Sequence, residues 1–487
     1  VAPARPWGYI KGMDTITSGM TLPDGLLDRL ANIVGPGGLV TDVADMGPYI
    51  AEQRDLYRGE TPCIVRPAST EEVSRVVKTC HDAGVAIVPQ GGNTGLCGGA
   101  VASGEVIVSL TRMNRVREVD PVNFTMTVDS GCVLSSLQEV AEEHDRLFPL
   151  SLGAEGSCQI GGNLSTNAGG TTVIRYGNTR ELTLGLEVVL PNGDIWDGLT
   201  GLHKNNTGYD LKHLFIGAEG TLGIITGAVV KLFPRPRVRS TAFIALRDLE
   251  DVLEVLGRAR KASGDTVSGF ELIPRICIDI SIRHTEGNFE FLEGRHEWYA
   301  LIEFESSEEC LDLGAAMENF LAEAYEDGLV VDATIARSDS QRGQFWFLRE
   351  AMVLSQKPEG ASIKNDVSVP ISKVPQFISE ANAAVGEMYP GIRPLAFGHV
   401  GDGNVHYNLS QPVDGDPQEF LDRWDEITSR VADIALVMRG SFSAEHGIGK
   451  LKVHDLATRK SAVELNMMRA IKKTLDPSGL MNPGKVL

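Results

Sequence analysis

No two cysteines in this sequence stand at the C-x-x-C spacing. The seven cysteines are scattered between Cys63 and Cys310. This spacing excludes an obvious iron–sulfur or c-type haem motif and favours free thiols in a reducing compartment. Isolated cysteines of this kind are typical of small, buried apolar side chains.

Long apolar runs are also missing. No stretch approaches the roughly 20 residues that a membrane-crossing helix needs, and no charged-then-apolar leader opens the sequence. We therefore expect a soluble, cytoplasmic protein without a membrane span.

Positive charge is in deficit, because the net charge is −20. Such an acidic chain is a poor partner for nucleic acid or for an anionic membrane. An anionic ligand would then have to be held by backbone N–H groups, by a metal or by a few local cations.

Glycine, by contrast, is abundant, with 53 among 487 residues. This chain length predicts two or three domains. Strand and helix patterns alternate through residues 56–236, and Pro234-Arg235-Pro236 marks the end of that region. A second α/β region follows at 237–440, and a segment with a terminal helix at 441–487. Residues 1–55 are expected to form an N-terminal helical segment without chemistry.

Capping side chains predict where three helices begin. Ser69 stands three residues before Glu72, which is the spacing of a capping box. Ser135 and Gln138 repeat that spacing, and Asp248 precedes a helical apolar stripe.

Three glycine-rich stretches lie at residues 89–99, 153–170 and 217–226. Glycine-rich turns let backbone N–H groups converge on a phosphate without interference from Cβ atoms. None of the three has the G-x-G-x-x-G or the P-loop pattern. Their small, nearly uncharged surfaces together favour a large, flat nucleotide with a pyrophosphate tail.

Residues 398–408 read as two short strands joined by a tight loop at 401–404. If Val400 pairs with Val405, His399 lies directly opposite His406, with their Cβ atoms roughly 5 Å apart. Two imidazoles in this position make half of a divalent metal site. Because side chains alternate along a strand, Asn408 is expected on the same face as His406.

Glu445 and His446 stand side by side in the later stretch 443–449. His399, His406 and Glu445 together offer two imidazole nitrogens and one carboxylate oxygen. This donor set suits Zn²⁺ and would also accept Mn²⁺ or Fe²⁺. Three protein ligands leave coordination positions open, as in catalytic metal sites.

The glycine-rich stretches resemble the FAD-binding domain of the vanillyl-alcohol oxidase/p-cresol methylhydroxylase superfamily. The sequences G-H-V-G-D-G-N-V-H at 398–406 and S-A-E-H-G-I-G at 443–449, with Asn482-Pro483, are similar to its FAD-linked oxidase C-terminal domain. The resemblance covers nearly the whole chain beyond residue 55. Within the superfamily, the sequence is most similar to D-2-hydroxyglutarate dehydrogenases and to the related D-lactate and glycolate enzymes.

This resemblance implies an α/β (α+β) fold. It assigns residues 56–236 to a two-subdomain FAD-binding domain of the p-cresol methylhydroxylase type. Residues 237–440 become an α/β substrate (cap) domain that carries the His pair. Residues 441–487 become a C-terminal helical segment with the Glu-His motif.

The resemblance also implies FAD as the cofactor. Noncovalent attachment is expected because no histidine occurs between His81 and His144, although Cys97 and Cys158 stay open as attachment points. The residues expected to contact FAD are Pro89, Gly91, Gly92, Asn93, Thr94, Gly95, Leu96, Gly153, Gly156, Ser157, Gly161, Gly162, Asn163, Thr166, Asn167, Gly169, Gly170, Gly223, Ile224 and Asn482.

For the chemistry, the resemblance implies that C2 of a D-2-hydroxy acid passes a hydride to flavin N5. It makes His446 the catalytic base and a substrate contact. Arg349 and Lys364 match positions that bind substrate carboxylates, and Asn408 would bind the carboxylate or the hydroxyl. Asp402 is expected to orient a ligand histidine or its own loop.

One departure from the family pattern affects the substrate. Where 2-hydroxyglutarate enzymes can place a Thr for the distal carboxylate, this sequence has Val353. Oxidation of D-2-hydroxyglutarate to 2-oxoglutarate is the first expectation, and D-lactate, D-malate and glycolate stay open.

No second cofactor motif is present, so electrons are expected to leave to an external acceptor such as electron-transfer flavoprotein or a quinone. A non-catalytic flavin subunit of an electron-transfer assembly is an alternative from another class, and it predicts a broken metal set. The oligomeric state is left open, a homodimer included.

Overall fold

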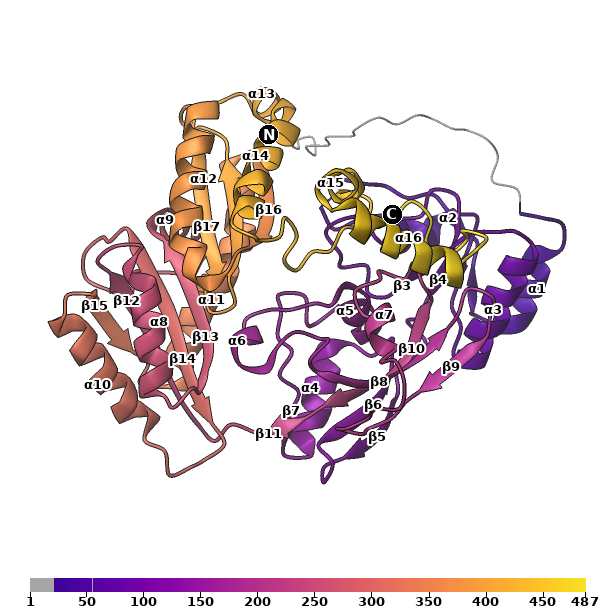
Figure 1. Cartoon of the computed structure of the whole chain (residues 1–487), viewed down its shortest axis with the longest axis horizontal. Coiled ribbons are helices and arrows are strands. Elements are labelled where there is room, and N and C mark those ends of the chain that lie inside the picture. The colour runs from indigo at the N-terminus through magenta and orange to yellow at the C-terminus, as the bar shows by residue number, and fades with distance from the viewer. Residues whose placement is uncertain (1–21, 55) are drawn as a thin grey trace.

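The computed structural model describes residues 22–54 and 56–487. The first part of the predicted N-terminal segment therefore lies outside the described residues. Figure 1 shows two halves side by side, one built from the first part of the chain and one from residues beyond about 237. The final, yellow segment crosses back onto the first half.

The first half contains two sheets of different character. A four-stranded sheet has the order β1-β2-β4-β3, in which β2, β4 and β3 are parallel. A five-stranded antiparallel sheet has the order β5-β6-β10-β8-β9, and β7 pairs with β11 at its side. The strands are β1 (Leu39–Val40), β2 (Ile64–Val65), β3 (Ile87–Gln90), β4 (Val106–Ser109), β5 (Val116–Asp120), β6 (Thr125–Asp129), β7 (Arg146–Leu147), β8 (Thr183–Val189), β9 (Ile195–Gly198), β10 (Ile224–Lys231) and β11 (Phe233–Pro234).

The helices of this half bury an apolar face against these sheets. Val73, Val76, Val77 and Cys80 repeat at helical spacing and lie in the core of the four-stranded sheet. The helices of this half are α1 (Leu26–Val34), α2 (Val43–Ile50), α3 (Thr70–Asp82), α4 (Leu134–Glu143), α5 (Ile160–Thr166), α6 (Val173–Tyr176) and α7 (Lys212–Phe215).

The second half is built on one seven-stranded antiparallel sheet of order β15-β12-β14-β13-β17-β18-β16. This order places β17 and β18, which carry His399 and His406, between β13 and β16, away from β15 at the opposite edge. The strands are β12 (Val238–Leu246), β13 (Val267–Pro274), β14 (Trp298–Ser306), β15 (Val330–Ile335), β16 (Ser362–Ser368), β17 (Arg393–His399) and β18 (Asn404–Ser410).

Helices cover both faces of this sheet. The apolar stripes of α8, α10, α12 and α14 share one core with one face, and those of α9 and α11 share another core with the opposite face. The elements are α8 (Asp251–Ala262), α9 (Arg275–His284), α10 (Leu313–Glu326), α11 (Asp339–Ser355), η1 (Lys357–Glu359), η2 (Ile371–Lys373), α12 (Val374–Met388), α13 (Pro417–Asp422) and α14 (Trp424–Val437).

The C-terminal segment, with α15 (Val453–Arg459) and α16 (Ala462–Leu475), returns to the first half. Met481 bridges to Ile87 and lies in the core of the four-stranded sheet. Asn482 Nδ2 donates to the carbonyls of Gly99 at 3.0 Å and Glu219 at 2.8 Å. Glu445 and His446 therefore lie between the two halves.

One of the three predicted caps is confirmed and two are wrong. Ser69 accepts from the Glu72 amide at 3.2 Å, although Glu72 reaches back to the Ala68 amide. Helix α4 begins at Leu134, before Ser135, and has no side-chain cap. Asp248 does not cap α8, which begins at Asp251 without a side-chain cap.

In the part of the chain that the structure describes, none of the helices combines the length and apolar character that crossing a membrane requires.

Candidate active site

The histidine hairpin forms as predicted, but with a different register. Phe397, not His399, is paired with His406 across β17 and β18. The prediction that His399 directly opposes His406 is therefore wrong. The turn takes up more residues than expected, since the amides of Asp402 and Gly403 both donate to the His399 carbonyl at 3.1 Å. His399 lies two residues beyond Phe397, so both histidines still project from one face.

The three predicted metal ligands come together between the halves. His399 Nε2 lies 3.4 Å from His406 Nε2 and 3.6 Å from Glu445 Oε1. Metal–ligand bonds of about 2.0–2.1 Å at a tetrahedral centre place donor atoms roughly 3.4 Å apart. The donors His399, His406 and Glu445 therefore fit a divalent cation such as Zn²⁺.

His399 is held by a residue that the sequence did not point to. Its Nδ1 lies 2.5 Å from Oε1 of Glu271 on β13, and both side chains are buried. Burial alone would raise the pKa of Glu271, but the Arg349 guanidinium and His399 lower it. A carboxylate on Nδ1 leaves Nε2 as the nitrogen for a metal. A single charged residue in the apolar strand Val267–Pro274 was the signal available in the sequence.

Asp366 is the second residue that sequence reasoning missed. Its Oδ2 accepts the backbone N–H groups of Glu445 at 2.8 Å and His446 at 3.0 Å, and Oδ1 accepts Asn404 Nδ2 at 3.0 Å. Lys364 and Asp366 alternate onto the face of β16 that carries the site, which was the available signal.

Ligand atoms of Asp366, His406, Glu445 and His446 also lie within 4.8 Å of one another. Because three N–H donors already occupy Asp366, we favour the ligand set that contains His399.

His446 lies against the glycine-rich half. It lines a pocket together with Gly95, Leu96 and Gly162, and its Nδ1 lies 3.6 Å from Asp366 Oδ2. Burial lowers the pKa of His446 to about 4 against the opposing effect of Asp366. The imidazole is therefore neutral and able to accept a proton.

That pocket contains many of the residues predicted to contact FAD. Those that line it are Pro89, Gly91, Asn93, Thr94, Gly95, Leu96, Gly161, Gly162, Thr166, Gly223 and Ile224. Ser130, Ser165 and Glu219 line it as well and were not predicted. Gly92, Gly153, Gly156, Ser157, Asn163, Asn167, Gly169, Gly170 and Asn482 lie outside the lining.

The wall of this pocket and the residues near it fit a polar cofactor. Ser130 Oγ, which lines the pocket, is buried without a hydrogen-bond partner among the described residues, and so are Gln159 Oε1, Asn163 Oδ1 and Asn482 Oδ1, which lie outside the lining. Buried polar atoms are normally paired, so these atoms fit a ligand that supplies partners. A Cβ on Gly95 or Gly162 would meet no protein atom within 4 Å, and both glycines therefore leave space for a ligand.

The pocket and the metal ligands are neighbours. His446 lines the pocket and directly follows the predicted ligand Glu445 in the chain. The loop after His446 is fixed to the pocket wall, because Glu219 accepts the amides of Ile448 and Gly449, both at 2.7 Å.

The predicted substrate-binding residues surround the same cluster. Arg349 is buried, and its Nε donates to Glu271 Oε2 at 2.7 Å. Lys364 pairs across the strands with Asn408, two residues along from the pair Asp366 and His406. Asn408 Nδ2 donates to Gln356 Oε1 at 3.0 Å.

The sequence also drew attention to Val353 and Asp402. Val353 is 44% exposed on α11. Asp402 Oδ1 accepts the Asn404 amide at 3.0 Å, so Asp402 holds its loop.

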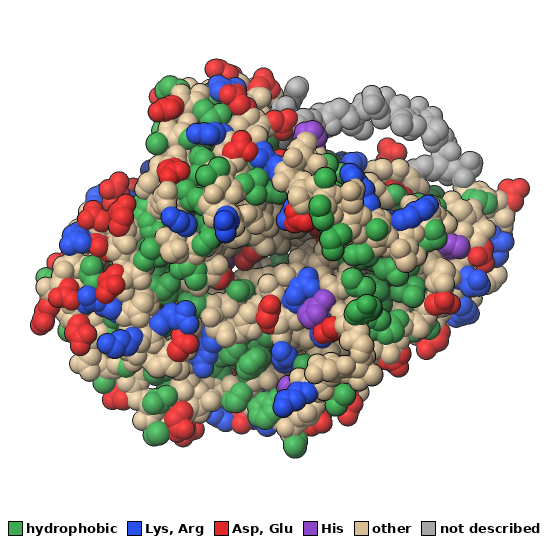
Figure 2. Space-filling model, in the orientation of Figure 1, with side chains coloured by type: hydrophobic (Ala, Val, Ile, Leu, Met, Phe, Trp, Pro, Cys, Tyr) green, Lys and Arg blue, Asp and Glu red, His purple; other side chains and the backbone are tan. Residues whose placement is uncertain are grey.

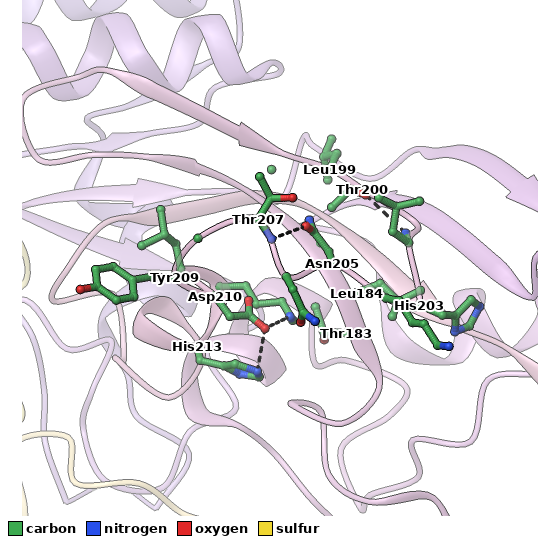
Figure 3. A pocket seen from close by; sticks show the side chains of 18 of the residues that line it. Thr183, Leu184, Leu199, Thr200, His203, Asn205, Thr207, Tyr209, Asp210 and His213 are labelled. Atoms are coloured by element: carbon green, nitrogen blue, oxygen red, sulfur yellow. Dashed lines mark hydrogen bonds and ion pairs between the residues drawn. The ribbon is translucent and has the colours of Figure 1, made fainter.

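A second hollow lies elsewhere in the described chain. It measures about 1330 Å³ and is lined by residues of β8, β9 and the connection 199–213 (Figure 3). Asp210 forms an ion pair there with Lys212, and its Oδ2 lies 3.3 Å from His213 Nε2. None of the predicted cofactor, metal or substrate residues lines this hollow, so its size alone does not make it the active site.

A glycine-lined pocket beside a His/His/Glu cluster is the arrangement expected of a flavoprotein oxidoreductase. Comparison with known proteins agrees: residues 61–198 match the family described as FAD binding domain, and residues 235–486 match FAD linked oxidases, C-terminal domain.

Individual proteins place the chain more closely. It is 40% identical over 463 residues to a probable mitochondrial D-2-hydroxyglutarate dehydrogenase of Oryza sativa subsp. indica, covering 94% of this chain and 80% of the relative. It is 39% identical over 453 residues to D-2-hydroxyglutarate dehydrogenase of Xanthomonas citri pv. viticola, covering 92% and 94%. The solved structure of p-cresol methylhydroxylase with substrate bound shares the fold, with a TM-score of 0.74 at 18% identity over 95% of this chain and 96% of that chain. The chain belongs to the FAD-linked oxidases and, within them, to the FAD-dependent hydroxyacid dehydrogenases.

Proposed function

We propose that this protein oxidises D-2-hydroxyglutarate to 2-oxoglutarate, with noncovalent FAD as the oxidant and a divalent metal at His399, His406 and Glu445. The observation that carries the proposal is the convergence of these three donors, at 3.4 and 3.6 Å, beside His446 and the glycine-lined pocket. The names of the two dehydrogenase relatives support the substrate.

The chain's own residues supply the acid–base part of the reaction. His446 accepts the hydroxyl proton of the substrate, and Asp366 holds the backbone of Glu445 and His446 in place. His446 Nδ1 lies on the Asp366 side, so Nε2 is the nitrogen left for that proton.

The cofactors supply the rest. A divalent cation at the cluster supplies the charge that favours loss of the hydroxyl proton, and bound FAD supplies the oxidant for the C2 hydrogen and its two electrons. Electrons then pass to an external acceptor, for which electron-transfer flavoprotein and a quinone are our candidates. Cys97 and Cys158 are buried, and burial raises the pKa of both thiols, which supports noncovalent attachment. Acid precipitation should therefore release the flavin.

A monocarboxylate such as D-lactate is the second candidate, because Val353 offers no hydrogen bond for a distal carboxylate.

Anaerobic bleaching of the FAD-loaded protein tests the proposal. D-2-hydroxyglutarate should bleach the flavin, its L-enantiomer should not, and a chelator should abolish the reaction until Zn²⁺ or Mn²⁺ is restored. Full bleaching after complete metal removal would contradict the metal role. Faster bleaching by D-lactate than by D-2-hydroxyglutarate would favour the second candidate.

A further inference from the structure

A loop of the first half reaches across to the second half. Residues 169–178 form this loop, with the short helix α6 at its tip, and Figure 1 shows α6 between the two halves. The base of the loop is closed, because the Ala168 carbonyl accepts both the amide of Thr179 at 2.9 Å and its hydroxyl at 2.7 Å. A loop whose two ends are tied together in this way holds its tip in a defined place.

The tip of this loop is hydrogen-bonded to the second half. Arg175 Nη1 donates to the carbonyl of Thr266 at 3.2 Å and to the carbonyl of Glu305. The Tyr176 hydroxyl donates to Glu305 Oε1 at 3.1 Å. The loop is therefore attached to the first half through its base and to the second half through its tip.

Ile174, at the same tip, lies against the turn of the histidine hairpin. Gly401 is in the turn between His399 and His406, and a Cβ placed on Gly401 would overlap Ile174 Cδ1 and lie 2.9 Å from Ile174 Cγ1. The three atoms nearest to that position all belong to Ile174. Ile174 also packs against the buried core of the second half. Gly401 thus leaves the space that Ile174 fills, and Ile174 limits where the turn can lie.

The base of the loop lies beside the third predicted ligand. Gly169 was predicted to contact FAD, but it lies outside the lining of the glycine-lined pocket. A Cβ placed on Gly169 would lie 3.0 Å from Val173 Cγ2 and 3.6 Å from Glu445 Oε1. Asp366 holds the backbone of Glu445, whereas Gly169 is next to its carboxylate. One loop of the first half therefore borders both chain segments that supply the predicted metal ligands.

We propose that Ile174 is a positioning residue of the metal site. By filling the space over Gly401, it holds the hairpin turn so that His399 and His406 meet Glu445 at the distances given above. The inference rests on the metal role in the proposed function and deepens it. A close-packed contact resists displacement, and a set of metal ligands tolerates only small displacements. Truncation of Ile174 should therefore loosen the site without removing a ligand.

The test measures metal binding by the FAD-loaded protein without substrate. Chelator competition gives the Zn²⁺ affinity, and the difference spectrum between Co²⁺-loaded and metal-free protein reports the ligand geometry. Ile174→Ala should weaken Zn²⁺ binding about tenfold and shift the Co²⁺ bands, as expected for a residue that orients the ligands from outside the ligand set. Ile174→Val removes only Cδ1 and should lose less. If Ile174→Ala does not retain FAD, Ile174→Val decides.

The matched control is Ile335→Ala. Ile335 is also a partly buried isoleucine packed against the same core, but it lies on β15 at the edge of the sheet away from the site. Its truncation should leave the Zn²⁺ affinity and the Co²⁺ spectrum as in the wild type. The inference is wrong if Ile174→Ala matches the wild type in both measurements, or if Ile335→Ala loses as much metal affinity as Ile174→Ala.

A second pair of variants tests the contact itself. Gly401→Ala places a methyl group where Ile174 now lies, so it should also weaken Zn²⁺ binding. In the double variant with Ile174→Ala, the overlapping Cδ1 and Cγ1 atoms are gone, and the added methyl group fills part of their space. The loss of affinity in the double variant should then be smaller than the sum of the two single losses. Losses that simply add would overturn the inference.

The wild type separates this inference from the proposed function. A wild type that binds neither Zn²⁺ nor Co²⁺ contradicts the metal role in the proposed function and removes the inference with it. A wild type that binds metal but does not oxidise D-2-hydroxyglutarate contradicts only the substrate, and the Ile174 and Gly401 variants still decide the inference.

Discussion

Glu271 and His399 form a buried carboxylate–imidazole pair, with Oε1 and Nδ1 2.5 Å apart. They lie on neighbouring strands and are separated by 128 residues in sequence. The other oxygen of the same carboxylate, Oε2, accepts a hydrogen bond from Arg349 Nε. One buried acid thus connects a metal ligand to a predicted substrate residue.

This pair predicts the effect of Glu271→Gln on metal binding. A glutamine amide no longer fixes the charge and tautomer of His399, so metal affinity should fall about 10- to 100-fold while FAD is retained. Chelator competition measures the affinity. The matched control is Glu303→Gln, a buried acid of the same sheet that is held by Arg342 and lies outside the site. Equal loss of metal in both variants would indicate general damage to the sheet.

His446→Gln tests the base directly. The amide cannot accept the hydroxyl proton, so flavin reduction should slow by about 10²- to 10⁴-fold. FAD absorbance and metal content should remain those of the wild type. Reduction at the wild-type rate would remove His446 from the role of base.

Asp366→Asn tests how the base is positioned. Its amide can still accept the N–H groups of Glu445 and His446, but it cannot also accept the Asn404 side chain or balance the imidazoles. We expect kcat to fall about 10- to 100-fold with little change in FAD binding. Asp251→Asn is the control, since Asp251 is a buried aspartate of α8 that is held by Arg247 and lies outside the site. A variant whose loss lies wholly in KM would contradict a positioning role.

Local sequence patterns predicted the parts of the site that lie close together in the chain. The hairpin supplies His399, His406 and Asn408 within a few residues, and alternation along the strands puts them on one face as predicted. The register was wrong because a loop with Gly401 and Gly403 allows more than one pairing of its flanking strands. Gly403, with φ +85°, lies in the left-handed region that glycine favours.

Contacts between distant segments could not be predicted in the same way. Glu271 and Asp366 carry no local motif, and only the folded sheet brings them to the site. The fold class followed from alternating apolar patterns and from the resemblance. The caps at Ser135 and Asp248 failed because each helix begins at another residue: α4 begins at the buried Leu134, and α8 begins at Asp251, whose carboxylate accepts the Asp248 amide.

The pKa of Lys364 predicts how substrate binding depends on pH. Its pKa of about 8 is lowered by burial, Arg54 and Lys357. The predicted contact of Lys364 with a substrate carboxylate needs the protonated form, so KM for D-2-hydroxyglutarate should rise as the pH passes 8, by up to about tenfold per unit. In Arg54→Ala, a repelling charge is gone, and the break should move to higher pH. Steady-state KM is measured between pH 6.5 and 9.5, which extends roughly one unit or more on either side of the expected pKa. A break in KM that Arg54→Ala leaves unmoved would mean that Lys364 is not the titrating group.

Glu219 holds the loop that follows His446 to the first half of the molecule. Its two carboxylate oxygens accept the amides of Ile448 and Gly449, and a Cβ on Gly447 would lie only 2.7 Å from Oε1. Glu219→Ala leaves both amides without an acceptor, and we expect a loss of about 2 kcal/mol in the free energy of unfolding. Glu219→Gln keeps one acceptor and should lose less. Denaturant unfolding of the FAD-loaded protein measures both, and equal stability of the alanine variant and the wild type would mean that solvent replaces Glu219 at no cost.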